Sequence, residues 1–230
     1  MPVKVQYPDT YFETFHEFES LESVVRYDKV VFLDCSNQSL TELPALPSGL
    51  KHLICCQNQL TVLPDLPLTL EALNCHSNQL TSLPALPDGL LSLICARNPL
   101  GSLPNPLPTS LTGLWCCENE LTGLPGLPTN LRELWLRHNS VTSLPDLPST
   151  LSILCVNSNQ LTALPVLPVG LKYLFCQDNQ MTELPASLEQ CVDLVFVNYD
   201  IDAISLSGDF KKFVDRVRNE QLQKVILPNV

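Results

Sequence analysis

The sequence contains no long apolar run and comparatively few basic residues. None of its apolar stretches reaches 18 residues, whereas a helix that crosses a bilayer needs about 20. The N-terminal sequence MPVKVQYPDTYFETF also lacks the apolar core of a secretory signal peptide. We therefore expect no membrane span and no export by the general secretory route, although specialised injection systems need no such core.

Positive charge is scarce throughout the chain. Thirteen Lys and Arg stand against 24 Asp and Glu, a net charge of −11, and residues 30–205 hold 15 acids and 5 bases. Proteins that bind nucleic acids or anionic membrane surfaces usually present a basic face. The composition argues against both classes and favours a protein partner, which would be steered toward the chain if it is basic. The sequence also contains no phosphate-binding loop and no H-E-x-x-H motif.

Most of the chain is one unit repeated many times. The unit L-x-x-L-x-C-x-x-N-x-L-T-x-L-P-x-L-P recurs every 20 residues, with a single spacing of 21, at residues 50–67, 70–87, 90–106, 111–128, 131–148, 151–168 and 171–185. Self-similarity at this period predicts a solenoid. We expect the leucines and the cysteine to point inward and the residues between them to face solvent, as in a short strand. Since one unit cannot bury its apolar edge alone, neighbours should stack into one core.

Two further features of the unit predict its local structure. One slot is asparagine in seven copies, namely Asn58, Asn78, Asn98, Asn119, Asn139, Asn159 and Asn179. An amide carries a donor and an acceptor, which suits a hydrogen-bonded ladder between turns. The L-P-x-L-P segment cannot lie inside a helix, because proline removes a donor and clashes with the preceding turn. We predict an extended, polyproline-like convex side without helices.

We interpret most of the ten cysteines as structural. Six fill the inward apolar slot of the repeat, namely Cys35, Cys55, Cys75, Cys95, Cys116 and Cys176. Neighbouring thiols would lie about 4.8 Å apart on the strand spacing, which is wide for the roughly 3.8 Å between the Cβ atoms of a disulfide. A line of thiols is not a tetrahedral zinc site either. We expect reduced cysteines, a reducing compartment, and no metal or other cofactor.

Repetition of L-P-x-L-P at this period over about residues 30–204 resembles the LPX subtype of bacterial leucine-rich repeats. That subtype occurs in YopM-like effectors and in the recognition domains of IpaH and SspH-type effector ubiquitin ligases. The resemblance implies an α/β leucine-rich-repeat solenoid with a parallel concave sheet, and an effector injected by a bacterium into the cytosol of a host cell. The ligases carry a catalytic C-x-D motif in a helical domain after the repeats. Cys191 begins a C-x-D match here, but it falls inside the ninth repeat, so we do not carry ligase activity over.

The pattern divides the chain into an N-terminal cap (residues 1–29), nine repeats (residues 30–204) and a C-terminal cap (residues 205–230). Apolar residues at helical spacing in residues 10–25, with a capping box of Thr10 and Glu13, predict a helix over the first repeat. The alternative is a partner-binding helix. In the ninth repeat we expect a strand at residues 193–197. A second helix is expected at residues 210–219 and a short strand at 224–227, the alternative being a linker into another domain.

The outward strand positions vary between copies and are therefore the candidate binding site. They place both tryptophans in adjacent repeats, within a concave strip of apolar and charged residues: Ile54, His76, Ile94, Arg97, Trp115, Glu118, Glu133, Trp135, Arg137, His138, Tyr173 and Phe175. Aromatic residues and arginine are enriched in binding hot spots, and apolar strips rimmed by charge mark interaction sites. The alternative is that the tryptophans pack on their neighbours and stiffen the sheet.

Three functions compete. The first is a protein-binding module or scaffold that binds a host protein on its concave face. The second is the substrate-recognition domain of an effector ubiquitin ligase whose catalytic domain is absent or on another chain. The third is a thiol enzyme, because Cys56 should lie beside His76 and Cys117 beside Arg137. No orienting third group or oxyanion site accompanies these pairs, so we favour the first function and expect no enzyme activity.

Overall fold

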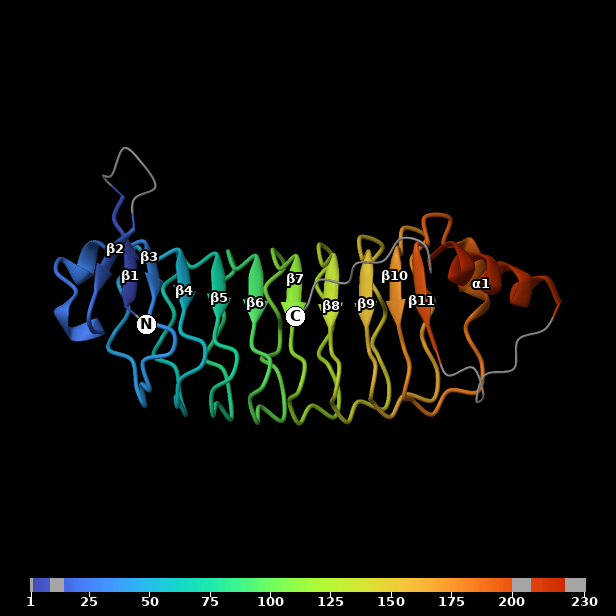
Figure 1. Cartoon of the computed structure of the whole chain (residues 1–230), viewed down its shortest axis with the longest axis horizontal. Coiled ribbons are helices and arrows are strands. Elements are labelled where there is room, and N and C mark those ends of the chain that lie inside the picture. Colours follow the sequence, from blue (N-terminus) through green and yellow to red (C-terminus); the bar gives the residue numbers. More distant parts are fainter. Residues whose placement is uncertain (1, 9–14, 200–207, 222–230) are drawn as a thin grey trace.

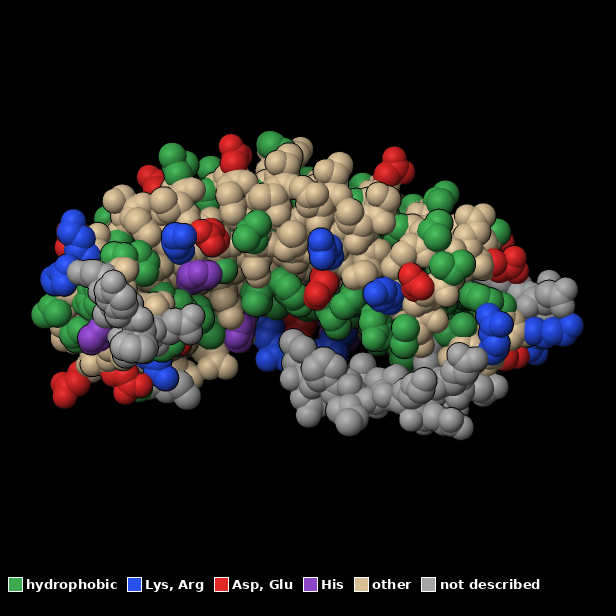
Figure 2. All heavy atoms as spheres, turned by 90° about the horizontal axis from the view of Figure 1, so that it is seen from above, with side chains coloured by type: hydrophobic (Ala, Val, Ile, Leu, Met, Phe, Trp, Pro, Cys, Tyr) green, Lys and Arg blue, Asp and Glu red, His purple; other side chains and the backbone are tan. Residues whose placement is uncertain are grey.

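The computed structural model describes residues 2–8, 15–199 and 208–221. They are built on one 11-stranded sheet with the strand order β11-β10-β9-β8-β7-β6-β5-β4-β3-β1-β2, drawn in Figure 1. Figure 2, turned by 90° from Figure 1, shows a curved outline with one hollow side. The strands line that concave side, and the connecting segments run over the convex side.

The strands β3 to β11 are short and mutually parallel. They span Phe32–Asp34, His52–Ile54, Ala72–Asn74, Ser92–Ile94, Gly113–Trp115, Glu133–Trp135, Ile153–Cys155, Tyr173–Phe175 and Phe196–Asn198. Consecutive copies pair in register, so Leu53 lies opposite Leu73 and Leu93 opposite Leu114. Because the register equals the repeat length, equivalent inward side chains stack into one core. The predicted leucine-rich-repeat solenoid with a parallel sheet is confirmed.

The segments that connect β3 to β11 contain no α-helix, so the α/β description was wrong for the repeats themselves. Their L-P-x-L-P stretches form neither helix nor strand. The exception to the predicted absence of helices is a 3-10 helix, η3 (Ala186–Gln190), where the second L-P of the unit is missing. This change lengthens the last repeat, because Leu174 pairs with Val197. The strand expected at residues 193–197 therefore starts later, and Val197 and Tyr199 occupy buried inward slots.

The N-terminal region contradicts the predicted helix. β1 (Val3–Gln6) pairs antiparallel with β3, and β2 (His16–Phe18) pairs antiparallel with β1. A strand forms here because the open edge of β3 has unpaired backbone groups, which a strand can satisfy and a helix cannot. Val3 and Val5, at alternate positions of β1, are fully buried. Two 3-10 helices follow, η1 (Leu21–Ser23) and η2 (Tyr27–Lys29). Residues 10–14 of the predicted helix, with its capping box, lie outside the described residues.

The C-terminal region contains the predicted helix, α1 (Gly208–Gln221). Val214 and Val217 are buried in the common core, and Phe213 packs against it from the side. The helix lies against β11, at the end of the array (Figure 1). The predicted strand at residues 224–227 lies outside the described residues. None of the described helices is both long enough and apolar enough to span a membrane.

Candidate protein-binding face

The outward side chains of the parallel strands form the concave face. Strand pairing places one row of them side by side: Ile54, Asn74, Ile94, Trp115, Trp135, Cys155 and Phe175. Adjacent strands lie about 4.8 Å apart, so neighbouring side chains in this row are within reach of each other. The row therefore makes one strip across the hollow side, with the two tryptophans next to each other in the middle of the array.

Trp115 lies against its own strand, over Gly113. A Cβ atom built at position 113 would come within 2.3 Å of two atoms of the indole, so the ring occupies the space that a side chain would otherwise fill. Gly113 is buried in consequence, while Trp115 remains partly exposed. The orientation of this indole is therefore set by the absence of a side chain two residues earlier.

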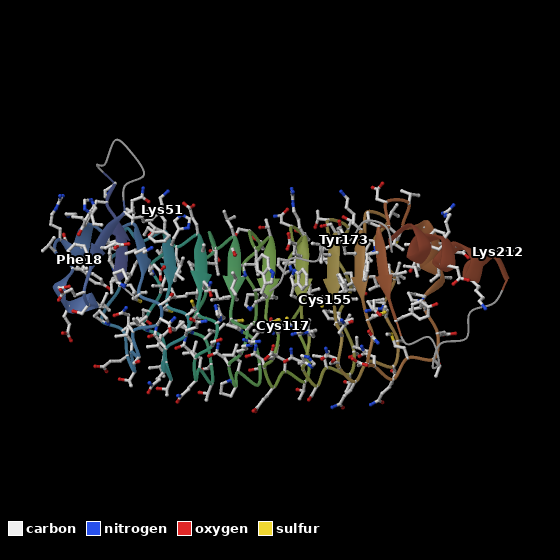
Figure 3. All side chains as sticks on the ribbon, in the orientation of Figure 1. Phe18, Lys51, Cys117, Cys155, Tyr173 and Lys212 are labelled. Atoms are coloured by element: carbon white, nitrogen blue, oxygen red, sulfur yellow. The ribbon has the colours of Figure 1, made fainter. Side chains whose placement is uncertain are left out.

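Trp135 is held from two sides. Its ring stacks on that of Phe175, with centroids 6.0 Å apart, and its Nε1 donates to Glu133 Oε2 at 3.3 Å. These rings come from β8 and β10 and close over Cys155 on β9, which is 3% exposed and is labelled in Figure 3. Phe175 also contacts Phe196, with centroids 4.7 Å apart. Phe175 is only 8% exposed, so the expectation of an exposed anchor at this position was wrong, whereas Trp135 stays partly exposed.

An ion cluster lies just beyond the C-terminal ends of β6, β7 and β8. Arg97 donates from Nε to Glu118 Oε2 at 3.0 Å and from Nη2 to Oε1 at 3.3 Å. Arg137 Nη2 lies 3.5 Å from Glu118 Oε1. The hydrogen bond from Arg97, more than any other contact, holds the pKa of Glu118 below its ordinary value. Three successive repeats thus bring two positive charges to one carboxylate.

The other predicted residues lie at different distances from the tryptophans and the ion cluster. Ile94 pairs with Trp115 across adjacent strands. Ile54 stands on β4, three strands away from β7, and does not join the aromatic group. His138 is exposed in the loop after β8, and Tyr173 is half-buried at the start of β10 (Figure 3). The structure therefore groups the two tryptophans and the two arginines on β6 to β8 and the loops after them. A separate set of ring contacts lies at the N-terminal end of the sheet, where Phe32 on β3 meets Phe15 and His52.

The two candidate thiol pairs have different surroundings. Cys56 Sγ lies 3.1 Å from Ser36 Oγ. The candidate base His76 places Nδ1 2.9 Å from Ser77 Oγ, and burial, followed by nearby positive charge, lowers its pKa. Burial raises the pKa of the Cys117 thiol even though a guanidinium beside it acts in the opposite direction. A nucleophilic cysteine is favoured by a lowered pKa, and at Cys117 the shift is in the opposite direction.

The remaining cysteines belong to the core, except Cys155, which is covered by rings on the outward side. All ten are free thiols, and eight of them are buried. Burial raises the pKa of Cys35 to about 12 and that of Cys191 to about 11. Cys191, which begins the C-x-D match, donates from Sγ to the carbonyl of Pro168 at 3.4 Å. In the part of the chain that the structure describes, no group of three His, Cys, Asp or Glu is placed to hold a metal ion.

Asparagine amides connect consecutive repeats. Asn98 is 4% exposed. Its Nδ2 donates to the carbonyls of Cys75 and Cys95 at 3.1 Å each, and its Oδ1 accepts from the N–H of Leu80 at 3.0 Å. The same two-sided pattern is made by Asn58, Asn78, Asn139, Asn159 and Asn179. Asn119 differs, because its buried Oδ1 has no partner among the described residues. The ladder fixes the loops that follow the strands, and with them the positions of the ion cluster.

Three residues of this face were missed by reasoning from the sequence. Gly113 sets the position of an indole, Cys155 is the small residue beneath two rings, and Phe196 extends the aromatic contact. A signal for the first was present, since glycine inside a strand often marks a close approach by another group. The last was hidden by the longer final repeat, which moves Phe196 to a position opposite Tyr173.

A family model described as Leucine Rich Repeat matches residues 130–151, one of the turns whose strand and asparagine were described above. The protein is a leucine-rich-repeat protein. A search of curated protein sequences finds no match.

Solved structures similar to this leucine-rich-repeat protein include bacterial effectors. YopM from Yersinia enterocolitica shares 31% identity over 77% of this chain and 48% of YopM, with a TM-score of 0.54. YopM from Yersinia pestis shares 29% identity over 77% of this chain and 62% of that chain, with a TM-score of 0.55. A Shigella effector LRR domain shares 28% identity over 82% of this chain and 76% of that domain, with a TM-score of 0.53. The chain thus spans about half the length of the first of these.

Proposed function

We propose that this leucine-rich-repeat protein is a binding module whose concave face takes a segment of a partner protein, and that it acts as a bacterial effector inside a host cell. The single observation that carries the binding role is the pair of partly exposed indoles at the centre of the hollow side, Trp115 and Trp135. Tryptophan supplies a large contact area at low entropic cost and is over-represented among residues that dominate binding energy. The effector role rests on likeness to YopM and to the Shigella effector domain.

The two tryptophans differ in what they contribute to the fold. Trp135 stacks on another ring and covers a buried cysteine, so part of its role is structural, as the alternative interpretation of the sequence held. Trp115 lies over a glycine of its own strand and stays partly exposed, so its ring is available to a partner. The binding role should therefore be tested on Trp115.

The test is capture of a partner from host-cell lysate by purified protein. Trp115→Ala is expected to lose the captured partner while its unfolding temperature stays within about 3 °C of the wild type, because few core contacts are removed. Gly113→Ala should also weaken capture, since a Cβ there displaces the indole without deleting it. Leu68→Ala is the matched control, because it removes an apolar side chain that is 87% exposed on the connecting segments. Equal capture by all four proteins would refute the proposal.

A second candidate function uses the same surface. Likeness to the Shigella effector LRR domain, 76% of which this chain covers, favours a recognition domain that delivers a bound substrate to a separate catalytic domain. We distinguish the two by asking whether the captured partner becomes ubiquitinated in cells that express this chain together with the bacterial proteins encoded beside it. Ubiquitination that Trp115→Ala abolishes would favour the recognition domain over a scaffold.

A further inference from the structure

We propose that the concave face selects an extended peptide segment in which an Asp or Glu side chain stands two positions from an apolar side chain. This inference rests on the proposed binding function and specifies the chemistry of the partner. It follows from where the arginines lie relative to the tryptophans.

Positive charge on the concave face is concentrated at one place. Among the outward positions of β3 to β10 and of the loop after each, Arg97 and Arg137 are the two permanently positive residues of the described repeats. Their side chains remain 60% and 44% exposed while they share the carboxylate of Glu118. Within this cluster, two guanidinium groups against one carboxylate leave a surplus of one positive charge, in a chain whose net charge is −11. The nearby carboxylate of Glu133 accepts from the indole of Trp135 instead. An anionic group is the complement of this site.

The guanidinium groups also keep donors for such a group. A guanidinium has five N–H donors in a planar fork that matches a carboxylate. Arg97 uses its Nε and Nη2 on Glu118, whereas Arg137 reaches that carboxylate with Nη2 alone, at 3.5 Å. A carboxylate from a partner would therefore be held mainly by Arg137, and Glu118 keeps that side chain on the concave side.

The spacing of the two features fits a polypeptide. Arg137 follows Trp135 by two residues on the same side of the chain, so the indole row and the cationic site are about 7 Å apart along the strand direction. Side chains on one face of an extended peptide repeat at the same distance of about 7 Å. A segment lying along the strands can place an apolar side chain on Trp115 and Trp135 and the carboxylate of its second-next residue on Arg137.

The experiment is selection of a random heptapeptide phage library on the immobilised protein. Wild-type protein is expected to enrich peptides in which a Leu, Phe or Trp is separated by one residue from an Asp or Glu. The double variant Arg97→Glu with Arg137→Glu should instead enrich Lys or Arg at that place. Arg132→Ala with Lys172→Ala is the matched control, because it removes two exposed charges of the same sign just before the strands, and it should select the same peptides as the wild type.

Affinity for one enriched peptide gives the second readout. By fluorescence anisotropy, Arg97→Ala with Arg137→Ala should weaken binding at least tenfold, which corresponds to about 1.4 kcal/mol, with an unfolding temperature close to that of the wild type. Enrichment that depends on Trp115 but shows no acidic residue, or is indifferent to the arginine variants, would overturn this inference alone. Binding of a phosphoserine peptide but not of its Glu counterpart would overturn it too. No enrichment at all would count against the proposed function itself.

Discussion

Removal of the Asn98 side chain measures what the asparagine ladder contributes to stability. The substitution Asn98→Ala takes one amide donor from each of two buried carbonyls, those of Cys75 and Cys95, but each keeps a bond from a neighbouring asparagine. The N–H of Leu80, in contrast, loses the acceptor that it has in the structure. A buried donor left unpaired costs about 1–3 kcal/mol, and each weakened carbonyl about 0.5–1 kcal/mol.

Asn119→Ala is the built-in comparison. Its Nδ2 makes the same kind of bonds, to the carbonyls of Cys95 and Cys116, but its Oδ1 accepts none, so no N–H is orphaned by the change. We expect a loss of about 3 kcal/mol for Asn98→Ala and about 1.5 kcal/mol for Asn119→Ala. For a chain of this size the unfolding temperature should fall by roughly 6–12 °C and 3–6 °C.

Urea unfolding followed by circular dichroism, together with thermal scans, measures both variants. The free energies of unfolding are compared only if the variants share the same dependence of free energy on urea concentration, so that a change in compactness is not mistaken for a change in stability. If the two variants lose the same free energy, the bond between the Asn98 Oδ1 and the repeat before it adds nothing. If Asn98→Ala loses less than about 0.5 kcal/mol, asparagine is not what holds the loops.

Three further predictions address the thiols, the ion cluster and the tryptophans. Iodoacetamide on native protein at pH 8 should modify Cys56 and Cys117 and spare the eight buried thiols, with Cys117 the slower because burial raises its pKa; peptide mass spectrometry measures this. Folding lowers the pKa of Glu118 below its ordinary value of 4.5. The ionised carboxylate therefore stabilises the folded protein above pH 4.5, and this stabilisation is lost as the pH falls through the lower pKa of the folded state. The urea midpoint of Glu118→Gln should depend less on pH than that of the wild type. Trp135→Ala should lower the unfolding temperature more than Trp115→Ala, because about 0.5–1.5 kcal/mol of aromatic stacking is lost with it.

The repeat architecture could be read from the sequence because the period fixes the register. Once equivalent leucines recur at one interval, parallel strands paired at that interval are the arrangement that stacks every apolar edge, as the pairing of Leu53 with Leu73 illustrates. The N-terminal region could not be read in this way. Its apolar residues have helical spacing, but the edge of β3 would otherwise leave backbone N–H and C=O groups unpaired. β1 forms hydrogen bonds with this edge, and β2 pairs with β1.

The contents of the concave face were predictable, but the exposure of its rings was not. The register identifies the neighbours of each outward side chain, yet it does not give their rotamers. At Cys155 a small side chain lets the rings of Trp135 and Phe175 meet above it, which buries one predicted anchor. The position predicted for the last strand, β11, was wrong because the 20-residue period ends with the last L-P-x-L-P segment. The segment that replaces it contains η3, whose length the repeat does not determine.

The N-terminal edge of the sheet is formed by two strands, β1 and β2, that lie outside the repeats. The free edge there is β2, which is antiparallel to β1 and therefore runs in the same direction as the strands of the repeats. None of its residues, His16–Phe18, is buried, and Glu17 pairs with Lys4 at its surface. This edge therefore offers no inward apolar side chain on which a further repeat could stack, and charged side chains protect a sheet edge against pairing. The hairpin thus acts as a terminator, which favours a discrete particle over a filament made of head-to-tail copies.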